Sequence, residues 1–269
     1  MKGLWILGLF LLLAVLAPWL TSYRPEQVFS GMSLLPPFFS AQGSWAHWLG
    51  TDDLGRDLWT RLIFGARVSI GFGFLIVFVS VAVGSFLGLM AGYFGGFVDR
   101  SVVRFVDVVM SLPSLLLAMV VVAILGPGLM NAVWAVSIVS LPGYIRIVRA
   151  AVMNEKSKDY VQATRSFGAS HGHLIFKSIA PNCLAPLIVQ ATLGFSDAVL
   201  NMAALGFLGL GAQPPTPEWG VMLGDSRAYM ESAWWLVTWP GLSLLVVVLT
   251  FNLVGDGLRD HLDPKLRGL

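Results

Sequence analysis

The sequence predicts an all-α polytopic membrane protein with about six transmembrane helices. Of its 269 residues, 56% are hydrophobic and only 12% are charged, whereas soluble domains carry about 25% charged residues. The alternating pattern of a membrane barrel is absent, so helices must satisfy the backbone hydrogen bonds in lipid. Four uncharged stretches reach the length of about 20 residues that a bilayer requires. They run from Leu4 to Ser22, from Val68 to Val98, from Val108 to Ile145 and from Ser232 to Gly255.

A breaker cluster divides the third stretch, which is too long for one helix. Gly126-Pro127-Gly128 interrupts the pattern, because proline lacks an N–H donor and glycine is conformationally free. The division predicts spans over Val108–Leu125 and Ala132–Ile145. A sixth span is expected between Leu184 and Leu210, although two polar residues weaken its hydropathy signal.

The chain reads as one membrane domain with a notable loop on each side. We expect a first transmembrane helix at 1–22, an external loop at 23–67, a transmembrane core at 68–255 and a cytoplasmic tail at 256–269. A cleaved signal peptide is the alternative for the N-terminal run. Ala17-Pro18-Trp19 offers no small-x-small cleavage site, so a retained helix is favoured.

Positive charge predicts the orientation, because Lys and Arg concentrate on the cytoplasmic side of membrane proteins. With both termini inside, twelve of the 17 basic residues lie in the cytoplasm, and the longest basic loop runs from Arg146 to Lys177. The five outside are Arg24, Arg56, Arg61, Arg67 and Arg227.

Small residues and prolines mark the spans. Gly84, Gly88 and Gly92 share one helix face, which lets another backbone approach closely. That face packs either within this subunit or against a partner subunit. Pro113 and Pro142 interrupt two spans, where each would kink its helix, as a hinge or as a fixed bend.

The chain shows no catalytic, cofactor or metal motif. A phosphate-binding G-x-x-x-x-G-K-[ST] loop is missing, and the cluster Gly206–Gly211 ends a hydrophobic span instead of joining a strand to a helix. His171 and His173 are two residues apart, so a helix would point them in different directions; we expect both to be solvated. Lone Cys183 cannot form an intrachain disulfide.

Two acidic residues lie nearest to membrane depth, where ionisable groups are often functional. Asp107 follows two arginines, so we expect a capping or ion-pair role near a helix start. Asp197 is in the middle of a span, with Asn201 one turn later on the same face. These two residues either line a pathway or bond a neighbouring helix.

The basic loop contains a predicted helix–Gly–helix hairpin at 155–181. Gly168 supplies the left-handed position that ends the first helix, Ser170 caps the second, and Pro181 is expected to stop it. Two faces result: Tyr160, Thr164 and Phe167 on the first helix, and Leu174, Ile175, Ser178 and Ile179 on the second. Amphipathic faces of this kind either dock into another protein or fold onto their own bundle.

The hairpin resembles the EAA loop of ABC importer permeases, E-A-A-x-x-x-G-x9-I-x-L-P. Ala163, Gly168 and Pro181 agree with this consensus. Departures are found at Gln162, Thr164, Ser178 and Ala180, where the consensus has Glu, Ala, Ile and Leu.

Other stretches extend the likeness over nearly the whole chain. They resemble the C-type permease subunit of dipeptide, oligopeptide and nickel importers, with the dipeptide branch fitting best. The stretches are Leu49–Asp57, Pro181–Ile188, Ala204–Gly220 and Phe251–Pro264.

The resemblance implies a type I ABC importer permease fold and a non-catalytic subunit in the bacterial inner membrane. A homologous permease would complete the pathway, two cytoplasmic ATPases carrying ATP and Mg would grip the hairpin, and a periplasmic binding protein would deliver substrate; no nucleic acid is involved. The external loop and Gln213–Gly220 would face the binding protein or the partner permease. The implied coupling residues are Tyr160, Gln162, Ala163, Thr164, Phe167, Gly168, Ser170 and Pro181.

Several alternatives remain open at this point. The cargo could be dipeptides or short peptides, nickel, haem or antimicrobial peptides, because these importers share one scaffold. An ATPase-independent channel or secondary transporter is a distant alternative. An intramembrane enzyme would need paired catalytic groups, and Asp107 and Asp197 are the only candidate pair.

Overall fold

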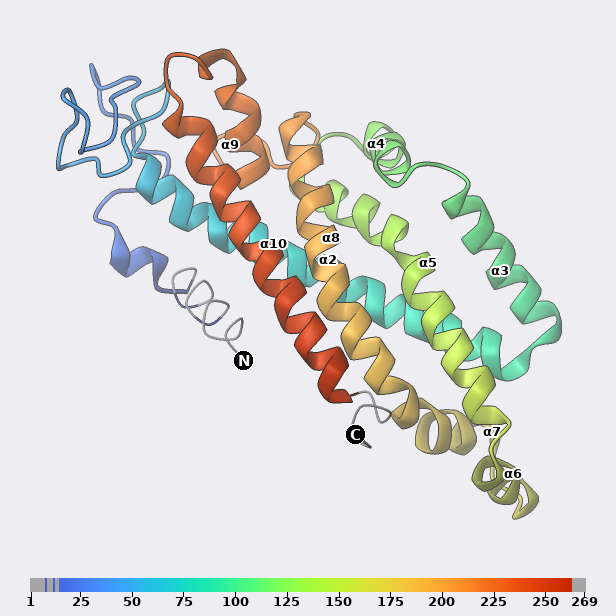
Figure 1. Cartoon of the computed structure of the whole chain (residues 1–269). Helices are drawn as coiled ribbons and strands as arrows, with labels where there is room; N and C mark the ends of the chain where they lie inside the picture. Colours follow the sequence, from blue (N-terminus) through green and yellow to red (C-terminus); the bar gives the residue numbers. More distant parts are fainter. Residues whose placement is uncertain (1–7, 9–11, 13–14, 263–269) are drawn as a thin grey trace.

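The computed structural model describes residues 8, 12 and 15–262, and its architecture is a bundle of long helices (Figure 1). The external loop and α9 (Trp219–Asp225) gather at one end of the bundle, whereas α6 (Asp159–Ser166) and α7 (His171–His173) lie at the opposite end. The first predicted span, Leu4–Ser22, falls mostly outside the described residues, although 15–20 are helical. The described residues form no β-strand, only two isolated bridges.

The helices α2 (Leu58–Phe94) and α5 (Leu129–Lys156) pack closely along the glycine face. A Cβ added at Gly84, Gly88 or Gly92 would lie 2.7–2.8 Å from atoms of α5. The predicted close approach is therefore confirmed, and its partner lies within this subunit. Only glycine permits this backbone separation.

Both ends of α2 differ from the predicted span, Val68–Val98. The helix begins ten residues earlier, at Leu58, because Asp57 caps it by accepting a hydrogen bond from the Thr60 amide at 2.8 Å. It ends at Phe94 because Gly95 and Gly96 adopt positive φ angles of 66° and 55°, which turn the chain out of the helix.

The predicted span Val108–Leu125 is wrong as a single helix. Two helices, α3 (Gly96–Met110) and α4 (Ser114–Leu125), meet there at a bend of 94°. Pro113 precedes α4 and breaks the run, because its ring excludes a continuous helix. Asp107 consequently lies in the last turn of α3 and not near a helix start. The break at Gly126–Gly128 is confirmed, since α5 begins at Leu129.

The last two long helices are α8 (Leu184–Phe207) and α10 (Trp235–Leu262). They pack through stacked rings of Phe195 and Phe251, whose centroids are 3.7 Å apart. Helix α10 runs past the predicted end at Gly255 into the predicted tail, and residues 263–269 lie outside the described part. In the described chain, four helical runs are apolar and long enough to cross a membrane, and the bent pair would make a fifth.

Buried charges hold the external loop against the start of α2. The Asp52 carboxylate accepts a hydrogen bond from Arg56 Nε at 2.6 Å and lies 3.4 Å from Arg61 Nε. His47 Nδ1 lies 2.8 Å from the Asp57 carboxylate. These side chains are almost completely enclosed, with Arg61 only 2% exposed. Burial of paired charges at this density indicates a fixed local structure.

The segment Gln213–Gly220 is only partly available to a partner. Its first three residues are exposed, whereas its last four are buried. The Glu218 carboxylate accepts hydrogen bonds from Ser69 Oγ at 3.0 Å and from the amide of Gly220 at 2.9 Å. Burial raises the pKa of Glu218, and the bonds to its carboxylate oppose that rise. The glutamate thus ties α9 to α2.

Candidate functional site

The predicted helix–Gly–helix hairpin is present at one end of the bundle. Helix α6 spans Asp159–Ser166, and Gly168 follows with a φ of 81°. Ser170 caps α7 (His171–His173), its hydroxyl accepting a hydrogen bond from the His173 amide at 3.4 Å. Both positions therefore have the local geometry that the sequence predicts.

Pro181 does not stop the second helix, contrary to the prediction. The helical run continues from α7 through a π-helix, Leu174–Ile179, and a 3₁₀ turn, Ala180–Cys183, directly into α8. Changes of helical pitch accommodate a proline because they re-space the backbone donors around the missing N–H. The hairpin is consequently joined to α8 without an intervening loop.

The apolar face of the second helix packs on the subunit's own bundle. Leu174, Ile175 and Ile179 are at most 3% exposed, and they cluster with Val148 and Val152 of α5. This face is therefore unavailable to a partner protein. Of the two alternatives for the amphipathic faces, folding onto the bundle holds for the second helix.

The first helix presents its residues outward. Phe167 is 92% exposed, and Tyr160 is 41% exposed. Gln162 and Ala163 are also exposed, whereas Thr164 is half-buried. Phe167 is the most exposed large apolar side chain among the described residues, and it directly follows α6 at the tip of the hairpin.

A buried glutamate fastens α6 to the end of α5. Glu155 accepts hydrogen bonds from Lys158 Nζ at 2.5 Å and from the Tyr160 hydroxyl at 2.6 Å. The same hydroxyl accepts a bond from Asn182 at 3.0 Å. Partial burial, followed by the bond to Glu155, raises the pKa of Tyr160 to about 12, so the phenol remains protonated at neutral pH.

A second set of contacts connects the hairpin to α2. The Tyr93 hydroxyl lies 2.7 Å from His171 Nδ1, and Lys156 Nζ donates to the Tyr93 carbonyl at 2.5 Å. His171 is exposed, as expected, but it also has this partner. The sequence offered little signal for Tyr93 or Glu155, because their roles depend on which elements meet in space. The hairpin is thus joined to α2, α5 and α8.

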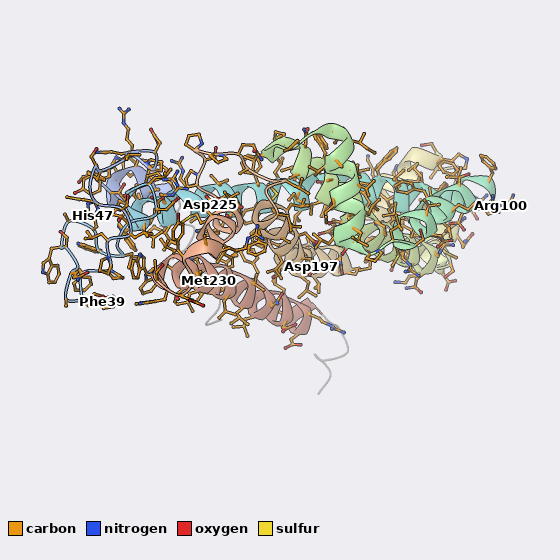
Figure 2. The ribbon with its side chains drawn as sticks, turned by 90° about the horizontal axis from the view of Figure 1, so that it is seen from above. Phe39, His47, Arg100, Asp197, Asp225 and Met230 are labelled. Atoms are coloured by element: carbon orange, nitrogen blue, oxygen red, sulfur yellow. The ribbon has the colours of Figure 1, made fainter. Side chains whose placement is uncertain are left out.

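A cavity of about 470 Å³ lies between the α3–α4 bend, α5 and α8. Asp197 and Asn201, the predicted pathway pair, both line it, and Figure 2 shows Asp197 between the labelled residues His47 and Arg100 of the two ends. Asn201 Nδ2 donates to the Asp197 carbonyl at 2.8 Å. The polar residues of the wall are Ser114, Ser140, Tyr144, Gln190, Asp197 and Asn201.

Metal ligands do not gather in the described part of the chain: no group of three or more His, Cys, Asp or Glu side chains could hold an ion there. Cys183 is buried and free. Asp107 and Asp197 come from different helices, α3 and α8, and only Asp197 lines the cavity.

Comparison with known families gives two matches. Residues 84–268 match the family described as the binding-protein-dependent transport system inner membrane component. Residues 1–37 match the N-terminal transmembrane domain of oligopeptide transport permease C. The first match contains the hairpin, the cavity wall and α10.

Individual relatives cover almost the whole chain. The dipeptide transport system permease protein DppC of Haemophilus influenzae is 51% identical over 98% of this chain and 90% of its own length. The protein of the same name from Escherichia coli K12 is 56% identical, covering 98% and 88%. A solved structure of the MetNI methionine ABC transporter, inward facing, has a TM-score of 0.63 at 20% identity, covering 77% of this chain and 97% of the other. The fold is therefore that of an ABC importer permease.

Proposed function

Because the chain belongs to the family of inner membrane components of binding-protein-dependent transport systems, as a permease subunit of an ABC transporter, we propose that it forms half of a translocation pathway for dipeptides or short peptides. The two proteins named above as dipeptide transport system permeases are 51% and 56% identical to this chain. We further propose that a homologous permease forms the other half and that a periplasmic binding protein supplies the cargo. The chain itself performs no chemistry.

The hairpin supports a role in coupling to two cytoplasmic ATPases, which would carry ATP and Mg. Its first helix is exposed, with Phe167 at the tip, while its second helix is fixed to the bundle. A force applied to the exposed helix would reach α2 and α5 through Tyr93 and Glu155. This combination of an exposed contact and a rigid base is the observation that carries the proposal.

The distribution of charge supports an orientation with the hairpin and both termini in the cytoplasm of a bacterial inner membrane. Two of the five basic residues on the opposite side, Arg56 and Arg61, are buried beside the Asp52 carboxylate. Asp52 offsets only one of these two charges, and acidic residues count little in the positive-inside rule, so the orientation rests on the excess of twelve basic residues over five.

Gly168 provides the test of the coupling role. A Cβ at this position meets no atom within 4 Å, so a substitution acts only through the left-handed backbone, which β-branched residues avoid. Gly168→Val should reduce peptide uptake at least tenfold while the chain still inserts in the membrane. Gly168→Asn is the matched control, because asparagine tolerates positive φ, and it should retain most uptake. Equal uptake by the wild-type and Gly168→Val proteins would refute the proposal that the hairpin transmits force from the ATPases to the bundle.

Two further measurements separate the alternatives. Co-purification of two ATPase subunits is expected for the importer, whereas an autonomous channel or secondary transporter would be isolated without them. Uptake by the complete complex should be measured with a panel of dipeptides, longer peptides, nickel and haem. Transport of nickel or haem without peptides would overturn the proposed cargo.

A further inference from the structure

The wall of the 470 Å³ cavity carries a single charged side chain, Asp197, among its described residues. We propose that the Asp197 carboxylate receives the α-ammonium group of the peptide as it crosses the membrane, which makes Asp197 a residue that determines specificity for a free N-terminus. This inference rests on the proposed function, peptide transport. It adds a recognition step inside the membrane to any selection made outside it.

The position of Asp197 along α8 favours a functional role for its carboxylate. The residue lies 13 positions after the start of α8 at Leu184, which corresponds to about 20 Å along the helix axis. A carboxylate at such a depth is costly unless a cation, hydrogen-bond donors or water face it, and the Asp197 side chain is exposed to the cavity. In the described part of the chain, the Asp197 carboxylate forms no hydrogen bond or ion pair. The one bond from Asn201 goes to the main-chain carbonyl of Asp197.

The remainder of the wall suits the rest of a short peptide. Cavities of about 300–1,000 Å³ hold small ligands, and this one falls in that range. Ser114, Ser140, Gln190 and Asn201 offer neutral donors and acceptors for peptide groups, while Val109, Val139 and other apolar residues face the side chains.

The negative charge of Asp197 favours the N-terminal ammonium group of the peptide over its C-terminal carboxylate. No Lys or Arg lines the described cavity, so a peptide carboxylate would find repulsion from Asp197 and no compensating cation. An ammonium would form a charge-assisted hydrogen bond, which is about twice as strong as a neutral one. A single carboxylate is too few ligands for a metal site, which argues against a cation-only cargo at this point.

Direct binding to the assembled transporter tests the inference apart from the binding protein. The complete complex of permeases and ATPases is placed in lipid nanodiscs, and its affinity is measured for dialanine, N-acetyl-dialanine and dialanine methyl ester. The wild type should bind dialanine and its methyl ester about tenfold more tightly than the acetylated form, the factor expected from one bond to a charged group. Asp197→Asn should bind all three with similar affinity.

A second variant tests the role of the carboxylate by a recovery of the binding preference and not by its loss alone. Moving the carboxylate one turn along the same face, as Asp197→Asn with Asn201→Asp, should recover a preference for the free amine. Absence of any preference in the wild type, or an unchanged preference in Asp197→Asn, overturns the inference. Dipeptide uptake by the wild-type complex with its binding protein tests the proposed function separately.

Discussion

The two ends of the bundle, which lie at opposite sides of Figure 2, place their charged pairs in different surroundings. At the external-loop end, Asp52, Arg56 and Arg61 are enclosed and paired with one another. At the hairpin end, the Lys158–Glu155 pair keeps its lysine half-exposed, and Phe167 projects into solvent. Enclosed pairs fix a structure, since a charge that loses its partner there has no access to water.

The difference supports the proposal that the hairpin end contacts the ATPase subunits. The external-loop end is stabilised within the subunit, with Glu218 and Trp219 also buried between α9 and α2. The hairpin buries its second helix against the bundle, whereas its first helix buries only Val161 and leaves Phe167 exposed at its end. We therefore expect substitutions at the first end to reduce stability, and substitutions at the second to reduce coupling.

The largest expected effect follows from removing Asp52. Asp52→Ala leaves Arg56 and Arg61 buried without their carboxylate, and breaking a buried ion pair in this way costs about 3–5 kcal/mol. The denaturation midpoint of the purified protein should fall sharply. Asp53→Ala is the control, because Asp53 is adjacent but forms no ion pair within 4 Å in the described chain. Equal midpoints for the two variants would show that the pairing is not what fixes this end.

Phe167→Ala should separate coupling from stability. The side chain is 92% exposed, so its removal should leave the denaturation midpoint unchanged. Loss of an aromatic anchor at an interface commonly costs more than 1 kcal/mol, which corresponds to retention of ATPase subunits falling about fivefold or more. Phe78→Ala, also at an exposed position but in α2, should retain them. Full retention in the Phe167→Ala complex would remove Phe167 from the contact.

Hydropathy predicted the long helices well where no charge intervened. It misplaced the start of α2 because Asp57 and Arg61 read as loop residues, although the first caps the helix and the second is buried within its first turn. The prediction that Pro181 ends the second helix was wrong for a related reason. Proline commonly ends a helix, but here a π-helix and a 3₁₀ turn continue the helical run past it. In both cases a rule based on residue type alone failed, because an aspartate can cap a helix as well as occupy a loop and a proline can be accommodated by a change of helical pitch.

The candidate sites divide in the same way. Gly168 and Ser170 were predictable because a turn and a cap depend on residues a few positions apart. The cavity was not, because its wall combines the α3–α4 bend, α5 and α8. Asp197 was found as an isolated charge in an apolar span, whereas Glu155 was lost among the charges of a polar loop.

The smallest predicted effect concerns the base of the hairpin. Tyr160→Phe removes the hydroxyl that bonds Glu155 and Asn182, and one net hydrogen bond contributes about 1 kcal/mol to stability. The pKa of Tyr160 is raised to about 12, above its unfolded value of about 10. The stabilisation is therefore complete below pH 10 and is lost as the pH rises towards 12.

Between pH 6 and 9 the difference in denaturation midpoint between wild type and Tyr160→Phe should accordingly stay constant. Tyr23→Phe removes the same atom at the external-loop end, where the hydroxyl bonds no other described residue, and it should have no effect. A midpoint for Tyr160→Phe equal to that of wild type would mean that Glu155 is held by Lys158 alone. The first helix of the hairpin would then be held on α5 by a half-exposed ion pair, the bond from Gln162 to the Lys156 carbonyl and the packing of Val161, and the Tyr160 hydroxyl would transmit none of the force proposed to reach α5.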